Sequence, residues 1–91
     1  MMNPRYRKAE HVSSRRVQDE LVLLDLEEGQ YLVARGVGPE VWEMLVDGHS
    51  REEIVAAVAA RFEQDPAVIR RDVEGFISDL EAKSLLVREE D

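Results

Sequence analysis

The sequence contains no cysteine, which excludes disulfide bonds, thiolate metal ligands and a cysteine nucleophile. It also lacks any apolar run near the roughly 18 residues that a membrane-spanning helix needs. No signal peptide, with its apolar segment and small-residue cleavage site, follows Met1. We therefore expect a cytoplasmic protein that has no membrane partner.

Histidine is scarce and the glycines are scattered. The two histidines, His11 and His49, lie far apart in the sequence and do not have the spacing of metal ligands. No glycines form the Gly-x-Gly-x-x-Gly pattern that holds a phosphate group. The many carboxylates are explained by helix capping, by turns and by the polar side of the last helix. We expect no catalytic residue, no metal and no cofactor, and so a protein that is not an enzyme.

The length and the charge distribution limit the possible partners. Ninety-one residues are enough for one small domain, which we place at residues 1–91. The net charge is −8, but residues 1–18 carry +4 and residues 19–91 carry −12. We expect residues 1–8 to be a frayed basic arm and residues 88–91 to be a solvated acidic tail. The acidic body argues against a nucleic-acid partner, because the phosphate backbone is bound mainly by lysine and arginine.

Two short apolar runs predict a β-hairpin. Leu21–Leu26 and Gln30–Ala34 are too short for helices and are rich in residues that favour strands. Gly29 can take the left-handed conformation that closes the turn between them. Glu10–Ser14 can add an edge strand, which would give an antiparallel sheet.

The second strand of this hairpin is apolar on both faces. Alternation places Tyr31 and Val33 on one face, and Leu32 and Ala34 on the other. Two interpretations remain open at this point. Either the helices and the first strand cover all of this apolar surface, or part of it forms a groove for a peptide beside a sheet edge.

The rest of the chain predicts three helices. Pro39 suits the first position of a helix, which can end at Gly48. Ser50 and Glu53 have the spacing of a capping box at the start of a second helix. Asp65, followed by proline, is a typical N-cap for a third.

The largest apolar side chains and one glycine add to this interpretation. Trp42, Phe62 and Phe76 are expected to contribute to the core. Gly75 costs about 1 kcal/mol relative to alanine inside a helix, which suggests that another group approaches it closely. Together the elements predict an α+β fold with a three-stranded antiparallel sheet followed by three helices. Its outline is that of a winged helix-turn-helix with the wing placed first.

The ordered set of motifs has the spacing of a known family. The motifs are Val22-Leu23-Leu24-Asp25, Gly29-x-Tyr31, Gly38-x-x-Val41-Trp42-x-x-Leu45-x-x-Gly48, Ser50-x-x-Glu53-Ile54, Ile69-x-x-Asp72-Val73-x-x-Phe76-Ile77-x-x-Leu80 and Leu85-Leu86. From about Glu20 to Val87 the chain resembles the PqqD-like family, the recognition elements for precursors of ribosomally synthesised, post-translationally modified peptides. It is most similar to the discrete leader-binding protein of lasso-peptide pathways. The chain departs from many relatives at Ala34-Arg35, where they have Leu-Asn, and at Ser84, where they often have glycine.

This resemblance implies a binding site for a leader peptide. The peptide would add as an antiparallel strand beside Gln30–Ala34 and lie against the last helix, whose contact residues would flank its core stripe. The expected peptide-binding residues are Gln30, Tyr31, Leu32, Val33, Ala34, Val68, Asp72, Gly75, Phe76 and Asp79.

The resemblance also implies partners. The expected partners are the precursor peptide, a separate transglutaminase-like leader peptidase and an asparagine-synthetase-like cyclase. One alternative is a peptide chaperone of quinone-cofactor biosynthesis that delivers its precursor to a radical enzyme. A winged-helix transcription regulator ranks behind both, because the cations of the last helix lie among acidic residues.

Overall fold

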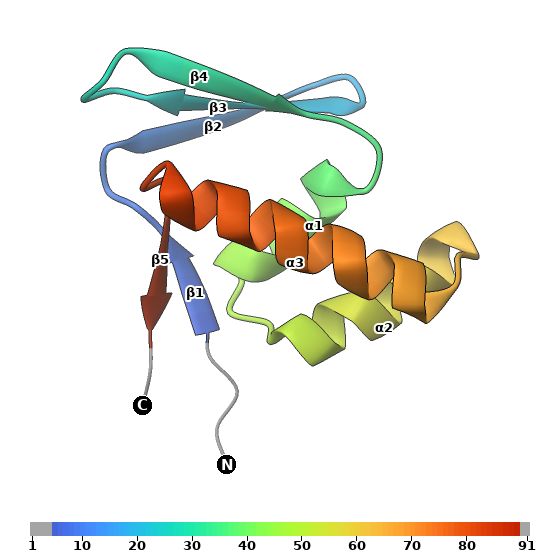
Figure 1. Cartoon of the computed structure of the whole chain (residues 1–91). Helices are drawn as coiled ribbons and strands as arrows, with labels where there is room; N and C mark the ends of the chain where they lie inside the picture. The colour runs from blue at the N-terminus through green and yellow to red at the C-terminus, as the bar shows by residue number, and fades with distance from the viewer. Residues whose placement is uncertain (1–4, 90–91) are drawn as a thin grey trace.

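The computed structural model describes residues 5–89, in which a small sheet lies over a group of helices (Figure 1). Strands β2 (Val12–Val17), β3 (Glu20–Asp25) and β4 (Gln30–Ala34) form an antiparallel sheet in the order β2-β3-β4. Within residues 5–89 the helices are α1 (Gly38–Val46), α2 (Arg51–Phe62) and α3 (Pro66–Ala82). The prediction of an α+β fold with this sheet and these helices is confirmed.

The β3–β4 hairpin is closed by an aspartate and a glycine. Asp25 is 4% exposed, and its carboxylate accepts hydrogen bonds from the backbone N–H groups of Glu27 and Glu28. Gly29 has the left-handed φ of 70° that was expected at this turn. The turn spans four residues, because Leu26 belongs to it and not to the strand. The resulting register pairs Leu23 with Leu32.

Helices α2 and α3 begin at the predicted caps, whereas α1 has no side-chain cap and begins at Gly38, one residue before the proline predicted as its first residue. Ser50 accepts a hydrogen bond from the N–H of Glu53, whose carboxylate accepts one from the N–H of Ser50. Asp65 accepts a hydrogen bond from the N–H of Ala67 at the start of α3. Each cap satisfies N–H groups that have no partner inside the helix. None of the helices in residues 5–89 combines the length and apolar character needed to cross a membrane.

The core lies between the sheet and the helices, and it includes one of the three expected aromatic side chains. Trp42 is 2% exposed, as predicted for a core residue. Phe62 was expected in the core, but it is the last residue of α2 and is 37% exposed. Phe76 is half-buried and packs against the core from its edge.

The expectation of a frayed basic arm is wrong for residues 5–8. These residues form β1 (Arg5–Lys8), which pairs antiparallel with β5 (Leu86–Glu89) near the other end of the chain. Tyr6 is 2% exposed and belongs to the core, so burial of its ring stabilises this pair of strands. Arg88 and Glu89 are likewise part of a strand and not of a tail. Residues 1–4 and 90–91 lie outside the described residues.

Candidate functional site

A groove of about 650 Å³ lies between β4 and α3. Such a volume falls within the range of about 300–1,000 Å³ that is usual for ligand sites. Its lining comes from β4 and the loop after it, from the start of α1, from the end of α2 and from one side of α3. The lining residues are Leu32, Val33, Ala34, Arg35, Gly36, Val37, Gly38, Val41, Phe62, Gln64, Val68, Ile69, Asp72, Phe76 and Asp79.

One wall of the groove is an unpaired strand edge. β4 pairs with β3, and within residues 5–89 no strand pairs with its other edge. Leu32 and Ala34 lie on the face toward the helices, where Ala34 is 6% exposed. An edge strand presents unpaired N–H and C=O groups that can accept another extended chain.

A glycine lets the chain after β4 pack closely against the strand. A Cβ atom on Gly38 would lie 2.9 Å from the Cβ of Ala34 and 3.8 Å from Cζ of Phe76. Because real Cβ atoms do not approach so closely, a side chain at position 38 would push the end of β4 away. Gly38 therefore helps to set the width of the groove at this end.

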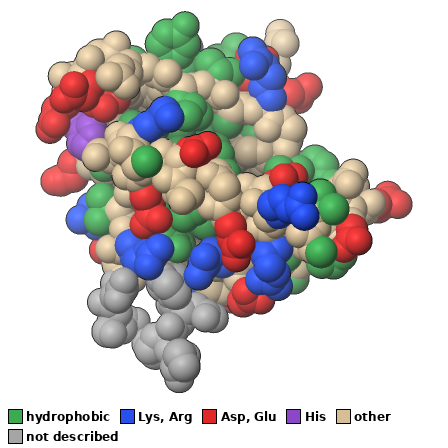
Figure 2. Space-filling model, viewed as in Figure 1, with side chains coloured by type: hydrophobic (Ala, Val, Ile, Leu, Met, Phe, Trp, Pro, Cys, Tyr) green, Lys and Arg blue, Asp and Glu red, His purple; other side chains and the backbone are tan. Residues whose placement is uncertain are grey.

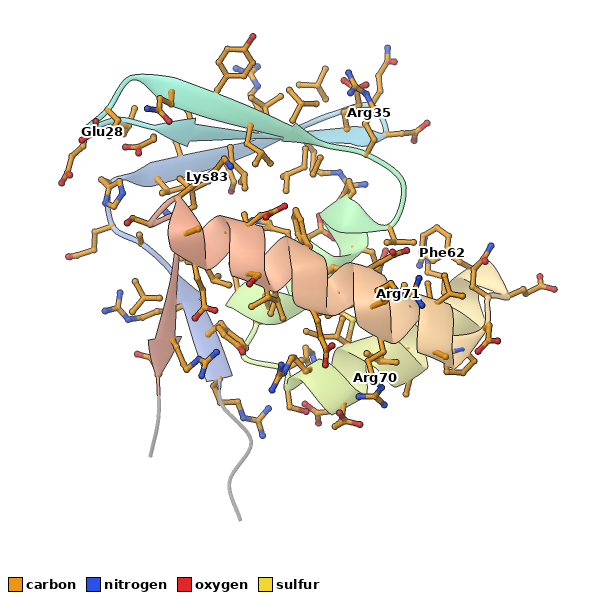
Figure 3. The ribbon with its side chains drawn as sticks, in the orientation of Figure 1. Glu28, Arg35, Phe62, Arg70, Arg71 and Lys83 are labelled. Atoms are coloured by element: carbon orange, nitrogen blue, oxygen red, sulfur yellow. The ribbon has the colours of Figure 1, made fainter. Side chains whose placement is uncertain are left out.

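The mouth of the groove carries exposed apolar side chains. Val68 on α3 is 48% exposed and Phe62 at the end of α2 is 37% exposed. Figure 3 shows Phe62 on the helical side and Arg35 on the sheet side of the opening, and both residues line it. Figure 2, in the same view, shows hydrophobic atoms at the surface between the sheet and the helical layer. Covering these groups would remove apolar area from water, which favours an apolar ligand.

The charged groups of the groove differ between its two walls. On the sheet side, the guanidinium of Arg35 is held by Glu20 in an ion pair. On the α3 side, Asp72 and Asp79 line the groove, and neither forms an ion pair within residues 5–89. Both aspartates are exposed. The unpaired charge at this groove is therefore negative and comes from α3.

The structure brings together most of the residues named from the sequence. Seven of them line the groove: Leu32, Val33, Ala34, Val68, Asp72, Phe76 and Asp79. Gln30 and Tyr31 instead line a small cavity at the start of β4, next to Lys83 and Leu85. The ring of Tyr31 is 72% exposed, because its side chain lies on the face of the sheet away from the helices.

Gly75 differs from the expectation. It lines neither cavity, and apart from its chain neighbours and the backbone of its own helix, nothing in the described chain comes within 4 Å of a Cβ atom built there. The prediction of a close neighbour at Gly75 is therefore wrong for the chain itself.

Sequence reasoning missed eight of the lining residues: Arg35, Gly36 and Val37 in the loop after β4, Gly38 and Val41 in α1, Phe62 and Gln64 at and just after the end of α2, and Ile69 in α3. The loop follows directly from the predicted strand, so its position beside the groove could have been inferred. Phe62 could not, because its spacing on α2 matches the apolar side of that helix.

Comparison with known proteins connects this geometry to a family. The family model described as coenzyme PQQ synthesis protein D (PqqD) matches residues 20–86, which is most of the chain. The chain belongs to the PqqD family. Its matched region includes β3, β4 and all of α3, and thus both walls of the groove.

Two solved structures resemble this PqqD-family chain over nearly its whole length. One, described as TbiB1 in complex with the TbiA(beta) leader peptide, is 35% identical, has a TM-score of 0.83 and is matched over 93% of this chain and 99% of its own. The other, described as lasso peptide synthetase B1 complexed with the leader peptide, also has a TM-score of 0.83. It is 21% identical and is matched over 90% of this chain and 96% of its own, and at this identity the likeness concerns the fold. No match was found among curated proteins.

Proposed function

We propose that this PqqD-family protein binds the leader region of a ribosomally synthesised precursor peptide during lasso-peptide maturation. The observation that carries the proposal is the unpaired edge of β4, which forms one wall of an apolar groove. The protein has no catalytic role in this proposal. It presents the bound precursor to a separate transglutaminase-like leader peptidase and an asparagine-synthetase-like cyclase. Since precursors are made on ribosomes, this role places the protein in the cytoplasm.

The relative with 35% identity supports the choice of ligand. That protein was solved in complex with a leader peptide, and it is matched over 99% of its length. The two folds are similar over nearly their whole length, with a TM-score of 0.83. Within residues 5–89, no three His, Asp or Glu side chains cluster as a metal site would require, so the groove itself suits binding better than metal-assisted chemistry.

Strand addition accounts for binding at this groove. Main-chain hydrogen bonds from the free edge of β4 would hold an extended peptide whatever its sequence. Apolar side chains of the peptide would enter the groove beside Phe62, Val68 and Phe76, which would supply specificity. The peptide would lie antiparallel to β4.

A second candidate is supported by the name of the family. A protein of coenzyme PQQ synthesis would use the same groove for a different precursor and would deliver it to a radical enzyme. The two candidates share their binding mode and differ in the peptide and the receiving enzyme. The near-complete match at 35% identity to a chain solved with a leader peptide, and the fold shared with a lasso peptide synthetase B1 solved with its leader peptide, support the lasso-peptide candidate.

The test compares groove and control variants in leader titrations. Val68→Gln removes an apolar side chain from the mouth of the groove and should weaken leader binding about three- to tenfold, since burying the half-exposed valine contributes roughly 0.7–1.5 kcal/mol. Val17→Gln is the matched control, because Val17 is also 48% exposed but lies in β2, at the other edge of the sheet. The labelled probes are the TbiA(beta) leader and the leaders of precursors encoded near the gene for this protein. Fluorescence anisotropy measures the affinity of each probe for each variant.

The affinities of the two variants distinguish binding at the groove from binding at another surface. Val17→Gln should leave leader affinity unchanged while Val68→Gln reduces it. Equal affinity of both variants and the wild type would place the peptide elsewhere. If no leader bound at all, the proposed function would be wrong.

A further inference from the structure

Within residues 5–89, Asp72 and Asp79 form no ion pair, although other acidic side chains of α3 do. Glu74 forms an ion pair with Arg51, and Glu81 forms one with Arg88, both at surfaces outside the groove. Asp72 and Asp79 line the groove and form no ion pair within the described residues. The remaining cations of α3, Arg71 and the C-cap Lys83, pair with neither of them and do not line the groove.

The two carboxylates stand on either side of Phe76. With a rise of 1.5 Å per residue, Asp72 lies about 6 Å from Phe76 along the helix axis and Asp79 about 4.5 Å on the other side. They are thus about 10 Å apart and act as two separate charges. Between them the half-buried ring of Phe76 faces the apolar part of the groove.

The orientation of α3 relative to β4 fixes how a bound strand would meet these charges. The groove joins the end of β4 to the first part of α3, with Ala34 and Val68 both in its lining. The small cavity joins the start of β4 to the end of α3, with Gln30 and Lys83 in its lining. β4 and α3 therefore run alongside each other in opposite directions, as Figure 1 also shows. A peptide antiparallel to β4 would run in the same direction as α3.

A strand in this position would present alternate side chains to α3. Residues two apart in a strand are separated by about 6.7 Å. This spacing is close to the distances of the two aspartates from Phe76 along the helix axis, and the long side chain of a lysine or arginine can bridge the difference. The residue two before an apolar anchor at Phe76 would lie beside Asp72, and the residue two after it would lie beside Asp79.

We propose that Asp72 and Asp79 make the groove selective for a leader with the pattern basic-x-apolar-x-basic. The inference rests on the proposed function, because it assumes an extended peptide antiparallel to β4. Its direction is part of the proposal: Asp72 selects the amino-terminal basic residue and Asp79 the carboxyl-terminal one. Each pairing lies at the rim of the groove, so it contributes to specificity more than to total affinity.

The experiment is a selection from a library of random 12-residue peptides displayed on phage. The wild-type protein should enrich peptides that contain an apolar anchor with lysine or arginine two residues to each side. Asp72→Asn should lose the preference on the amino-terminal side and keep the other, and Asp79→Asn should do the reverse. Glu74→Gln removes one negative charge from the same helix outside the groove, so this control should enrich the same peptides as the wild type.

Titrations then measure the size of the effect. Replacing one flanking lysine of a selected peptide by glutamine should weaken its binding to the wild type about two- to fivefold at low salt, as for exposed ion pairs. The same replacement should have no effect on binding to the matching Asn variant, as a double-mutant cycle requires. Because both aspartates are exposed, the Asn variants should unfold at the same temperature as the wild type.

Failure of the inference can be told from failure of the proposed function. Enrichment of apolar peptides with no basic flanks, or with flanks that both Asn variants retain, would overturn the charge selectivity and leave the groove assignment standing. If Val68→Gln enriched the same peptides as strongly as the wild type, the groove assignment itself would be wrong.

Discussion

Ser84 has a backbone conformation that side chains rarely adopt. Its φ is 60°, and it follows Lys83, the C-cap of α3. The N–H of Ser84 donates to the carbonyl of Glu81, and that of Leu85 donates to the carbonyl of Leu80. A helix that ends in this way needs a left-handed residue, which is usually glycine. Serine is therefore tolerated at this position, but at a cost in stability.

Replacing Ser84 by glycine should therefore stabilise the protein. The left-handed conformation costs a side-chain-bearing residue about 1–2 kcal/mol, while glycine adds entropy to the unfolded chain. We expect Ser84→Gly to raise the free energy of unfolding by about 0.5–1 kcal/mol in urea titrations. Ser84→Ala is the control, because it removes the hydroxyl but keeps the Cβ atom. An equal gain for alanine and glycine would contradict the backbone explanation.

Individual residues also show what a sequence pattern can and cannot assign. The Leu-Leu-Asp motif pointed to the family, and the structure gives Asp25 a structural role as the cap of the hairpin turn. Phe62 and Trp42 both lay on apolar sides of helices, yet only Trp42 is buried. Spacing predicts which side of a helix is apolar, but not whether another element covers it.

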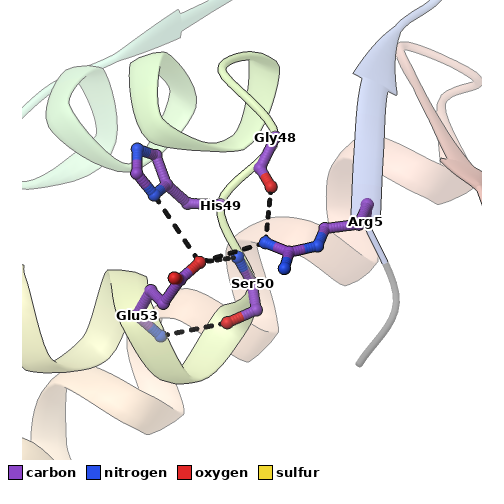
Figure 4. Close-up of polar contacts among 5 residues, drawn as sticks. All are labelled: Arg5, Gly48, His49, Ser50 and Glu53. Carbon is purple, nitrogen blue, oxygen red and sulfur yellow. Dashed lines mark hydrogen bonds and ion pairs between the residues drawn. The ribbon is translucent and has the colours of Figure 1, made fainter. Parts of the chain in front are cut away.

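Among the elements, the starts of α2 and α3 were predicted from the sequence, because each capping residue lies within three residues of the N–H group that it caps. Figure 4 shows the capping box of α2, in which Ser50 and Glu53 exchange hydrogen bonds as their spacing predicted. Arg5 from β1 adds hydrogen bonds to the carbonyl of Gly48 and to the carboxylate of Glu53. The hydrogen bond from the Ser50 N–H and that from Arg5 hold the pKa of Glu53 below its ordinary value.

The contact of Arg5 with the start of α2, also drawn in Figure 4, could not be predicted from local sequence patterns. Arg5 reaches this helix because β1 pairs with β5 near the opposite end of the chain. Neither strand has an alternating pattern that reveals its partner, and Tyr6 is a single aromatic residue in a basic segment. Pairing between distant segments depends on the whole core, so the sequence of either strand alone did not predict it.

Strand addition to β4 predicts different effects for neighbouring prolines. In an edge strand, alternate N–H groups point toward the paired strand and toward the free edge. One of the two variants Leu32→Pro and Val33→Pro should therefore lose roughly one main-chain hydrogen bond to the leader. Its leader affinity should fall at least fivefold, while its free energy of unfolding changes little. The other should destabilise the β3–β4 hairpin. Fluorescence titration and urea unfolding measure the two effects on each variant.

Alanine variants separate the side chain from the main chain. Leu32→Ala and Val33→Ala remove the side-chain contacts that the proline variants also lose, but they keep every backbone N–H group. Each proline variant is therefore compared with the alanine variant at the same position. Leu32 faces the helices and Val33 faces the other side of the sheet, which makes this correction larger for Leu32. If both prolines matched their alanine controls in leader affinity, binding would not involve the edge of β4.

The charge of the whole molecule is arranged unfavourably for a nucleic acid. The net charge is −8, and most arginines are already paired with glutamates across its surface: Arg5, Arg7, Arg16, Arg35, Arg51, Arg61, Arg70 and Arg88. Arg70 on α3 donates two hydrogen bonds to the carboxylate of Glu52, at 2.5 and 3.0 Å. The helix pair α2–α3 resembles a helix-turn-helix in outline only, because a phosphate would have to displace these glutamates.

This arrangement predicts that salt weakens the two kinds of ligand to very different extents. A leader held by main-chain hydrogen bonds and apolar contacts should lose less than about tenfold in affinity between 50 and 200 mM salt, since only the rim charges are screened. DNA held through 6–10 phosphates would lose about 10³- to 10⁵-fold over that range. We therefore expect a labelled leader to bind at both salt concentrations and random duplex DNA to show no binding even at 50 mM. Tight DNA binding with a steep salt dependence, together with no leader binding, would instead make the protein a winged-helix regulator. Its phosphate contacts would then have to come from cations outside the arginine–glutamate ion pairs, such as Arg15 and Arg71.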